Sequence, residues 1–311
     1  MIFLSHPDLP VIDQYLPTKK LAFMSSLNRN EQVFLYQALN KHSAFTHLVF
    51  SQVFENCFFL NEIGQWLGNL PALRYLSVVN TVGLSIEHIE LFFAGLAKSK
   101  TLEFLDVSGL NLGPEGAEYL SVAIKQLNIK NLHAHSNNFQ AQGIFYLLQC
   151  SSLISINISN NNVHPRRWVK VLRKASTNLQ KIILHGNKFT ENGFCALLKY
   201  ILKIKLIYLD LSYCALSAKQ ISLFCLHMVN YPWLRILKLH HCNLFENSVT
   251  DFARMLRTNT RLLDVNVNQN PINLDGVLKL VWALQKNYTL QQLHIDQIEG
   301  TILCDEKDNM L

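Results

Sequence analysis

The chain has 311 residues, of which 49% are hydrophobic and only 16% charged, and its formal net charge is +6. This composition is typical of an ordered chain rather than a disordered one. No stretch reaches the roughly 18 uninterrupted apolar residues of a membrane-spanning helix. The N-terminal segment also lacks the basic start of a secretory signal peptide, so the sequence favours a folded domain over a membrane span or an exported precursor.

The first 44 residues differ in pattern from the rest of the chain. Within them, residues 21–39 have apolar residues spaced as in one or two short helices. An open end of a repeat array exposes apolar surface that another segment must cover. We therefore expect residues 1–44 to form an N-terminal helical cap.

From Phe45 onward, an apolar residue recurs at intervals of 24 to 29 residues. Each recurrence begins the spacing L-x-x-L-x-L, which alternates as in a short strand. In residues 102–120, this strand-like part lies around Leu105 and Val107, and Pro114 then opens a segment with helical spacing. Such a short unit cannot bury both apolar faces alone, so it requires neighbouring copies. The leading residues of the ten copies are Phe45, Leu73, Leu102, Ile129, Leu153, Leu179, Leu206, Leu234, Leu262 and Leu290.

A polar or thiol slot follows the strand-like part of most copies. It holds Asn137, Asn161, Asn187, Asn270, Cys214 or Cys242. With this slot the chain resembles leucine-rich repeat proteins of the ribonuclease-inhibitor-like subclass. The resemblance implies an α/β solenoid shaped as a horseshoe, with a parallel sheet on the concave face and helices on the convex face. It also implies that the slot residue bonds to the backbone of the turn after the strand.

The resemblance divides the chain into three parts. Residues 1–44 are the helical cap, residues 45–296 form about ten leucine-rich repeats, and residues 297–311 form a short polar C-terminal tail that we expect to be weakly docked. The repeats that begin at Ile129 and Leu153 are the shortest, so we expect small convex segments there.

Side chains alternate across a strand, so the residues between the inward leucines should face outward from the concave sheet. Rings and histidines are frequent at these outward positions. Exposed rings are typical of protein interfaces, and histidine adds possible pH sensitivity. We therefore predict partner binding by His47, Tyr75, Phe104, Asp106, His133, His135, Lys181, His185, Tyr208, Asp210, Ile236, Lys238, His240 and Asp264. Asp106 beside His133, and Asp210 beside Lys238, are expected lateral pairs.

Catalysis and cofactors are not indicated by the sequence. It has no nucleophile elbow, phosphate-binding loop or metalloprotease helix, and the outward histidines do not converge with other ligands as a metal site requires. Seven scattered cysteines without a C-x-x-C pair favour free thiols in a reducing cytoplasm. We predict no enzyme activity, no metal and no cofactor.

A basic block between residues 166 and 205 has ten lysines and arginines against one acid, Glu191. We expect most of these cations on the convex face. The alternative to a protein-binding module is therefore a scaffold that associates with a membrane or nucleic acid through this block. A third alternative is an enzyme with an unrecognised site. A bound metal ion or a strongly reactive cysteine would favour this alternative over a binding module.

The irregular repeats and the Asn- and Lys-rich composition also resemble the leucine-rich repeat effectors of intracellular bacteria such as Legionella. That resemblance implies type IV secretion into the host cytosol, and capture or inhibition of a host protein or another effector. The acidic tail with its hydrophobic end is compatible with such an export signal. We expect a monomer that forms a heterodimer with its protein partner.

Overall fold

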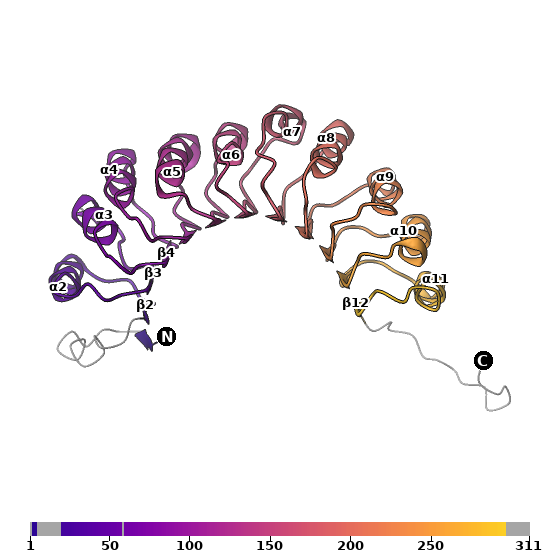
Figure 1. Cartoon of the computed structure of the whole chain (residues 1–311), viewed down its shortest axis with the longest axis horizontal. Helices are drawn as coiled ribbons and strands as arrows, with labels where there is room; N and C mark the ends of the chain where they lie inside the picture. The colour runs from indigo at the N-terminus through magenta and orange to yellow at the C-terminus, as the bar shows by residue number, and fades with distance from the viewer. Residues whose placement is uncertain (1, 5–19, 58, 297–311) are drawn as a thin grey trace.

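The computed structural model describes residues 2–4, 20–57 and 59–296. Over these residues strands and helices alternate, and strands that follow one another in the chain are neighbours in one parallel sheet of twelve strands. Figure 1 shows an arc in which the strands line the inner side and the helices cover the outer side. The predicted α/β solenoid is confirmed.

The strands of the described residues are short. They are β1 (Ile2–Leu4), β2 (Lys20–Phe23), β3 (His47–Ser51), β4 (Tyr75–Val79), β5 (Phe104–Asp106), β6 (Asn131–His133), β7 (Ser155–Asn157), β8 (Lys181–Ile183), β9 (Tyr208–Asp210), β10 (Ile236–Lys238), β11 (Asp264–Asn266) and β12 (Gln292–His294). The helices that separate them are α2 (Arg29–Leu39), α3 (Leu60–Gly68), α4 (Ile86–Leu96), α5 (Gly113–Leu127), α6 (Gln140–Leu148), α7 (Trp168–Leu172), α8 (Glu191–Ile201), α9 (Ala218–Met228), α10 (Glu246–Thr258) and α11 (Leu274–Leu284), with a 3₁₀ turn, η2 (Pro165–Arg167), before α7.

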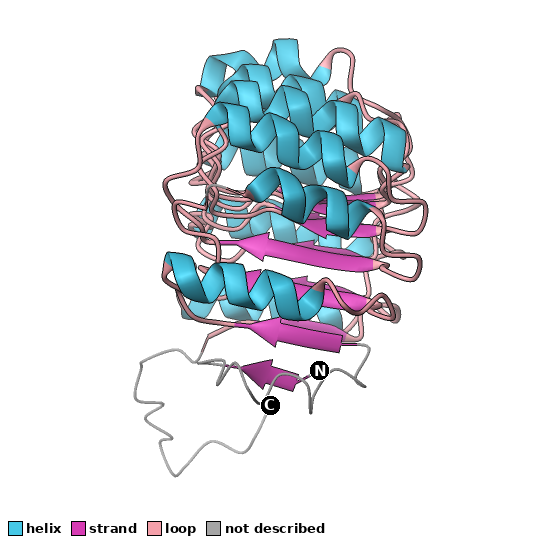
Figure 2. Ribbon diagram, turned by 90° about the vertical axis from the view of Figure 1, so that its left-hand side faces the viewer, coloured by secondary structure: helices cyan, strands magenta, loops and turns pink. Residues whose placement is uncertain are grey.

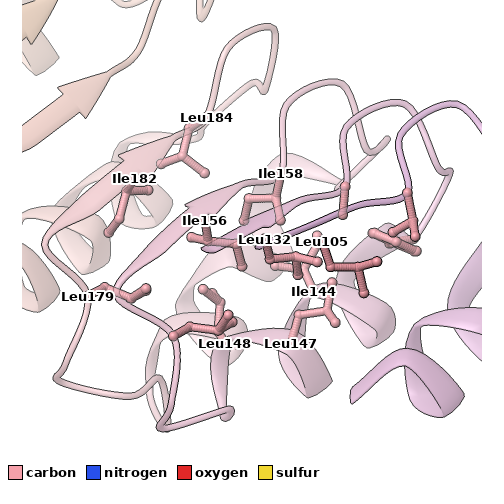
Figure 3. Packing of buried hydrophobic residues seen from close by; sticks show 14 of the residues in the cluster. Leu105, Leu132, Ile144, Leu147, Leu148, Ile156, Ile158, Leu179, Ile182 and Leu184 are labelled. Atoms are coloured by element: carbon pink, nitrogen blue, oxygen red, sulfur yellow. The ribbon is translucent and has the colours of Figure 1, made fainter. Parts of the chain in front are cut away.

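The core is a continuous stack of inward side chains between the sheet and the helices. The parallel register places Leu105, Leu132, Ile156 and Ile182 opposite one another in four neighbouring strands. All four are at most 2% exposed, and Figure 3 shows them above helix residues such as Ile144. Each repeat therefore buries the apolar face of the repeat before it, which explains why the leucine spacing recurs so regularly.

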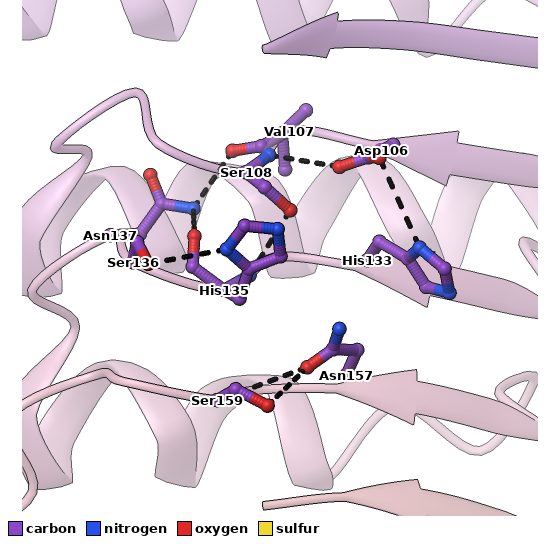
Figure 4. Close-up of polar contacts among 9 residues, drawn as sticks. All are labelled: Asp106, Val107, Ser108, His133, His135, Ser136, Asn137, Asn157 and Ser159. Carbon is purple, nitrogen blue, oxygen red and sulfur yellow. Dashed lines mark hydrogen bonds and ion pairs between the residues drawn. The ribbon is translucent and has the colours of Figure 1, made fainter. Parts of the chain in front are cut away.

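The slot residues join neighbouring repeats through backbone hydrogen bonds. Buried Asn137 accepts from the backbone N–H of Leu110 at 3.0 Å. It also donates to the carbonyl of Val107 at 2.8 Å, as Figure 4 shows. In a later repeat, the thiol of Cys242 donates to the carbonyl of Leu211 at 3.0 Å. These bonds satisfy backbone groups that the turn would otherwise bury unpaired, and they confirm the structural role that the resemblance implied.

The segment before residue 45 contains two strands that the sequence did not predict, β1 and β2, which pair in parallel. β2 pairs in parallel with β3, with Leu21 opposite Leu48, and Phe23 stacks on Phe50 at 5.5 Å. The helical expectation is therefore wrong for β2, because its apolar alternation extends the sheet and its core. It is correct for α2, which begins at a capping box formed by Asn28. One more strand–helix unit thus precedes the repeats that the sequence predicted.

The outer layer varies in helix length. α5 has 15 residues, whereas α7 has only 5 and follows the 3₁₀ turn. This agrees with the small convex segment expected in the repeat that begins at Leu153. Within the described residues, no helix is long and apolar enough to span a membrane. The predicted tail, 297–311, lies outside the described residues.

Candidate partner-binding face

The outward residues of the strands form columns along the concave side of the sheet. In the first column, the parallel pairings place His47 opposite Tyr75 and Tyr75 opposite Phe104, and this register continues to β12. The second column runs from Val49 to His294 with the same regularity. Both columns have the predicted register, because the period of the leucines sets that of the residues between them.

Four rings from β3 to β6 form a continuous row in the first two columns, which we call the ring row. His47 stacks on Tyr75 with centroids 5.5 Å apart, and Tyr75 stacks on Phe104 at 4.3 Å with an interplanar angle of 9°. Phe104 then meets His133 edge-on at 4.9 Å. All four side chains are partly exposed. A row of contacting rings offers a large, rigid contact area at low entropic cost.

The pKa shifts of His47 and Tyr75 in the ring row favour the uncharged forms of both side chains. Burial, and then the positive charge of Lys20, lower the pKa of His47 below its usual value. Burial, followed by the charge of Asp106, raises the pKa of Tyr75. Near neutral pH the row therefore offers neutral rings to a partner.

Asp106 lies beside the last ring of the row (Figure 4). Its Oδ2 is 3.9 Å from Nδ1 of His133, a distance too long for a direct hydrogen bond. Burial lowers the pKa of His133, and the opposing effect of Asp106 is smaller. The expected lateral pair is therefore present as a loose contact with a mainly neutral imidazole.

Four carboxylate or amide side chains of the second column cap the turn after their own strand. Each accepts a hydrogen bond from the backbone N–H two residues later, at 2.8 to 3.1 Å. They are Asp106, Asn157, Asp210 and Asn266. The two aspartates were predicted to bind a partner, but one oxygen of each already holds the turn, as in an Asx turn.

The C-terminal half of the face has a charged cluster. Lys181 lies over the ring of Tyr208, 4.6 Å from its centroid. Lys238 Nζ forms an ion pair with Asp264 at 2.7 Å. The sequence had paired Lys238 with Asp210, and this is wrong, because the Asp210 carboxylate caps its turn while the Asp264 carboxylate reaches the lysine from the other side. Burial, followed by nearby carboxylates, raises the pKa of Tyr208 to about 12.

Tyr213 is a central residue that the sequence reasoning missed. Its ring contacts His185 at 4.7 Å, His240 at 5.1 Å and His241 at 4.8 Å between centroids. Its hydroxyl donates to Oε1 of Gln269 at 3.1 Å and lies 3.0 Å from Nε2 of His240. We call these three histidines and Tyr213 the tyrosine–histidine cluster. It brings two predicted residues, His185 and His240, together at the rim of the sheet.

The residue type at the position just before the slot could have pointed to this cluster, because the backbone there is left-handed. Residues there have left-handed φ angles of 51° to 70° in successive repeats. They are Asn80, Gly109, Ser136, Asn160, Gly186, Tyr213, His241 and Gln269. Asn and Gly tolerate this conformation, whereas a bulky ring is rare. Two adjacent rings in a column otherwise made of small or amide residues mark a place where side-chain contacts outweigh backbone preference.

The remaining predicted residues lie between or beside these groups. His135 Nδ1 is 3.2 Å from the hydroxyl of Ser136, at the rim between the two halves of the face. Ile236 is half-buried and follows Tyr208 in the first column. The fourteen predicted residues thus fall into an N-terminal group around the ring row and a C-terminal group from Lys181 to Asp264.

The basic block of residues 166–205 does not form one surface. Only four of its ten cations lie in the convex helical elements: Arg166, Arg167, Lys170 and Lys199. The others lie in loops on either side of the sheet or, like Lys181, on the concave face. The expectation of a mainly convex block is wrong, because consecutive residues of a solenoid pass through every face of each repeat.

The described side chains bear on whether the protein has a metal site or a reactive cysteine. Over the described ranges, no group of three or more His, Cys, Asp or Glu residues could hold a metal ion. Five of the six described cysteines are buried. Burial raises the pKa of Cys242 to about 12 and that of Cys57 to about 11, which leaves both as weakly reactive thiols.

Comparisons with known proteins agree with this fold. Residues 98–121 match a family model described as "Leucine Rich repeat". The leucine-rich repeat-containing protein LegL7 from Legionella pneumophila has a similar structure, with a TM-score of 0.55 and 17% identity, covering 94% of this chain and 89% of that one. The chain is thus a leucine-rich repeat solenoid, and its fold resembles that of a Legionella protein of the same class.

Two human proteins have similar sequences. The chain is 26% identical over 225 residues to NACHT, LRR and PYD domains-containing protein 2 and 27% identical over 219 residues to NACHT, LRR and PYD domains-containing protein 14. These alignments cover 68% and 67% of this chain but only 21% and 20% of the relatives. The chain therefore spans about a fifth of their length.

Proposed function

We propose that the protein is a non-catalytic binding module that captures a protein partner on its concave face. The observation that carries this proposal is the ring row, in which four partly exposed rings from four strands lie in contact. Clustered rings on an otherwise polar surface are the usual energetic centre of a protein interface. A folded soluble chain rarely exposes such a row without a partner.

The scaffold suits this task because it holds the rings rigidly. Each ring stands on a strand whose neighbouring residues are buried in the core, as Leu76 and Leu105 are at 0% exposure. A preorganised surface loses little conformational entropy when it binds. The C-terminal group, with Tyr208 and the tyrosine–histidine cluster, offers a second and more polar contact area, so a partner of moderate size would touch both.

We further propose that the protein acts as an effector of an intracellular bacterium, secreted into the host cytosol, where it binds and inhibits a host protein or another effector. The fold that it shares with LegL7 of Legionella pneumophila supports this setting. In this proposal it is a monomer that forms a one-to-one complex.

The test is affinity capture with matched variants. Tyr75→Ala combined with Phe104→Ala removes the centre of the ring row. Phe145→Ala combined with Tyr146→Ala removes a half-buried ring pair of α6, on the convex side, and serves as the control. Proteins from host lysate that the native chain and the control retain, but the ring-row variant loses, are the expected partners.

Titration of a purified partner then measures the loss. If the ring-row variant binds like the native protein while the convex control loses binding, the concave-face proposal fails. If a purified candidate partner is chemically altered by the native chain, the non-catalytic part of the proposal fails instead.

A further inference from the structure

The two loop edges of the horseshoe differ sharply in charge. Figure 2 shows that the strands point the same way, so the segments that lead into strands lie on one side and those that leave them on the other. We call the segments between each helix and the next strand, from α2 to β12, the strand-start edge. The segments between each strand and the next helix, from β2 to α11, form the strand-end edge.

The strand-start edge has twelve lysines and arginines and one acid, Glu103, in its ten segments. Its cations are Lys41, Arg74, Lys98, Lys100, Lys130, Arg173, Lys174, Lys203, Lys205, Arg235, Arg261 and Lys286. With the segment after β7 taken only as far as η2, the ten segments of the strand-end edge have one lysine, Lys188, and one acid, Glu55. Both edges are loops in water, so solubility alone gives no reason for this difference.

The cations of the strand-start edge are available to a ligand. All except the half-buried Arg235 are exposed. Of these twelve cations, all of which lie in the described part of the chain, only Arg74 has an acidic partner, Glu103, at 3.1 Å. Helix dipoles favour cations just after a helix end. This accounts for the six cations within two residues of a helix end, such as Lys98, but not for the other six, such as Lys205.

Three of these cations line one shallow groove. Lys130, Lys203 and Lys205 surround a groove of about 610 Å³, together with uncharged polar side chains such as Asn178 and with Ile154. No carboxylate lines it. A neighbouring groove of about 260 Å³ shares Lys130 and adds Lys100 and Arg74, whose charge is paired with Glu103 in the same groove. A phosphate group would find several donors and no repulsive charge in the larger groove.

Exposed rings and aliphatic side chains accompany the cations. Trp233 is 41% exposed, and Lys205 Nζ lies 5.0 Å from the centre of its ring. Ile154 and Ile207 are 38% and 41% exposed, and Tyr288 is 94% exposed. Trp and Tyr beside lysines are the residues that membrane–water interfaces favour, because the ring enters the headgroup layer while the cation meets lipid phosphate.

We propose that the strand-start edge docks the protein on an anionic membrane surface, with the groove of Lys130, Lys203 and Lys205 receiving lipid phosphate. A bilayer fits better than RNA, because the cations are spread over nine of the ten segments of this side. The row of rings on which bases could stack lies instead on the concave face. Docking by this edge leaves the concave face open, so the inference does not depend on the proposed function.

Vesicle binding tests the inference. The native chain should bind vesicles of phosphatidylcholine mixed with phosphatidylserine, should not bind phosphatidylcholine alone, and should dissociate at high salt. Lys130→Ala, Lys203→Ala and Lys205→Ala together should reduce the partition coefficient about 100-fold, since each cation contributes about fivefold. The control changes Arg166, Arg167 and Lys170 to Ala, removing the same charge from the convex side, and should bind within about twofold of the native chain.

Tryptophan fluorescence tests the orientation. Of the four tryptophans, Trp66 and Trp168 are buried, and Trp282 is exposed on α11. The Trp282→Phe variant keeps Trp233 as its exposed tryptophan, and brominated lipid should quench the emission of that ring. The Trp233→Phe variant keeps Trp282 instead, and its emission should be quenched little on the same vesicles. The inference is overturned if the native chain does not bind anionic vesicles, if both triple variants lose binding equally, or if only polyuridylate RNA binds to the groove.

Discussion

The two faces of the same strands obey opposite constraints. In β9, Leu209 is 0% exposed and packs in the core, whereas the preceding Tyr208 faces outward under Lys181. Along the sheet, the inward position opposite Leu209 holds Leu, Ile or Val in β3 to β12. The outward position that holds Tyr208 in β9 instead holds a different type of residue in nearly every strand, from His47 in β3 to Gln292 in β12. Packing therefore restricts one face, and the other is free to specify a partner.

The largest expected effect comes from placing a charge on the inward face. Leu209→Asp should lower the free energy of unfolding by roughly 4 kcal/mol or more, because it buries an unpaired carboxylate. Tyr208→Asp makes the same change one residue earlier, on the outward face, and should keep a cooperative thermal transition. Circular dichroism melting of both variants checks this, and two similar melting curves would contradict the assigned faces.

The slot residues should show an intermediate effect. Asn187 donates to the carbonyls of Ile158 at 3.1 Å and Leu184 at 2.9 Å. Asn187→Leu removes both bonds and leaves the Ile158 carbonyl without this donor, whereas Leu184 keeps the backbone N–H of residue 187. We expect a loss of about 1–3 kcal/mol in urea unfolding. Cys214→Asn should cost much less, because the amide can make the bond that the thiol now makes to Leu184. Equal, negligible losses would argue against a ladder that stabilises the turns.

Removal of outward rings should affect affinity and hardly affect stability. Tyr75→Ala with Phe104→Ala should weaken partner binding by about 2 kcal/mol, roughly thirtyfold, because both rings are central to the ring row. The melting temperature should fall less than in Asn187→Leu, since neither ring lies in the core. Calorimetric titration beside a thermal melt measures both quantities. A large drop in melting temperature with unchanged affinity would assign the rings to the fold alone.

The smallest expected effect is the pH dependence of His133. Burial lowers its pKa in the folded state below the usual 6.5, so the unfolded chain binds more protons in the interval just below that value. Its contribution to stability is therefore present above about pH 6.5 and is lost as the pH falls through the lowered folded pKa. His133→Gln should unfold with a shallower pH dependence than the native chain between pH 7.5 and 5.5. Identical slopes in urea titrations would contradict this assignment.

Much of the architecture could be predicted from the sequence alone. The recurrence of leucine fixes how often the chain returns to the sheet, and the alternation within each strand fixes which side chains face inward. For that reason the columns from His47 and Val49, the buried slots such as Asn137, and the small convex segment near Pro165 all have the predicted places.

Only the tertiary structure decided which side chains meet. Periodicity determines the direction in which a side chain leaves the backbone, but not which neighbouring repeat it reaches. Lys238 therefore pairs with Asp264 instead of Asp210, and Tyr213 gathers three histidines from the loops on either side of its own. β2 was missed because Thr18, and not an apolar residue, stands at the leading position three residues before Leu21. The charge of the strand-start edge is likewise spread thinly along the chain and becomes one surface only when stacking brings ten loops to the same side.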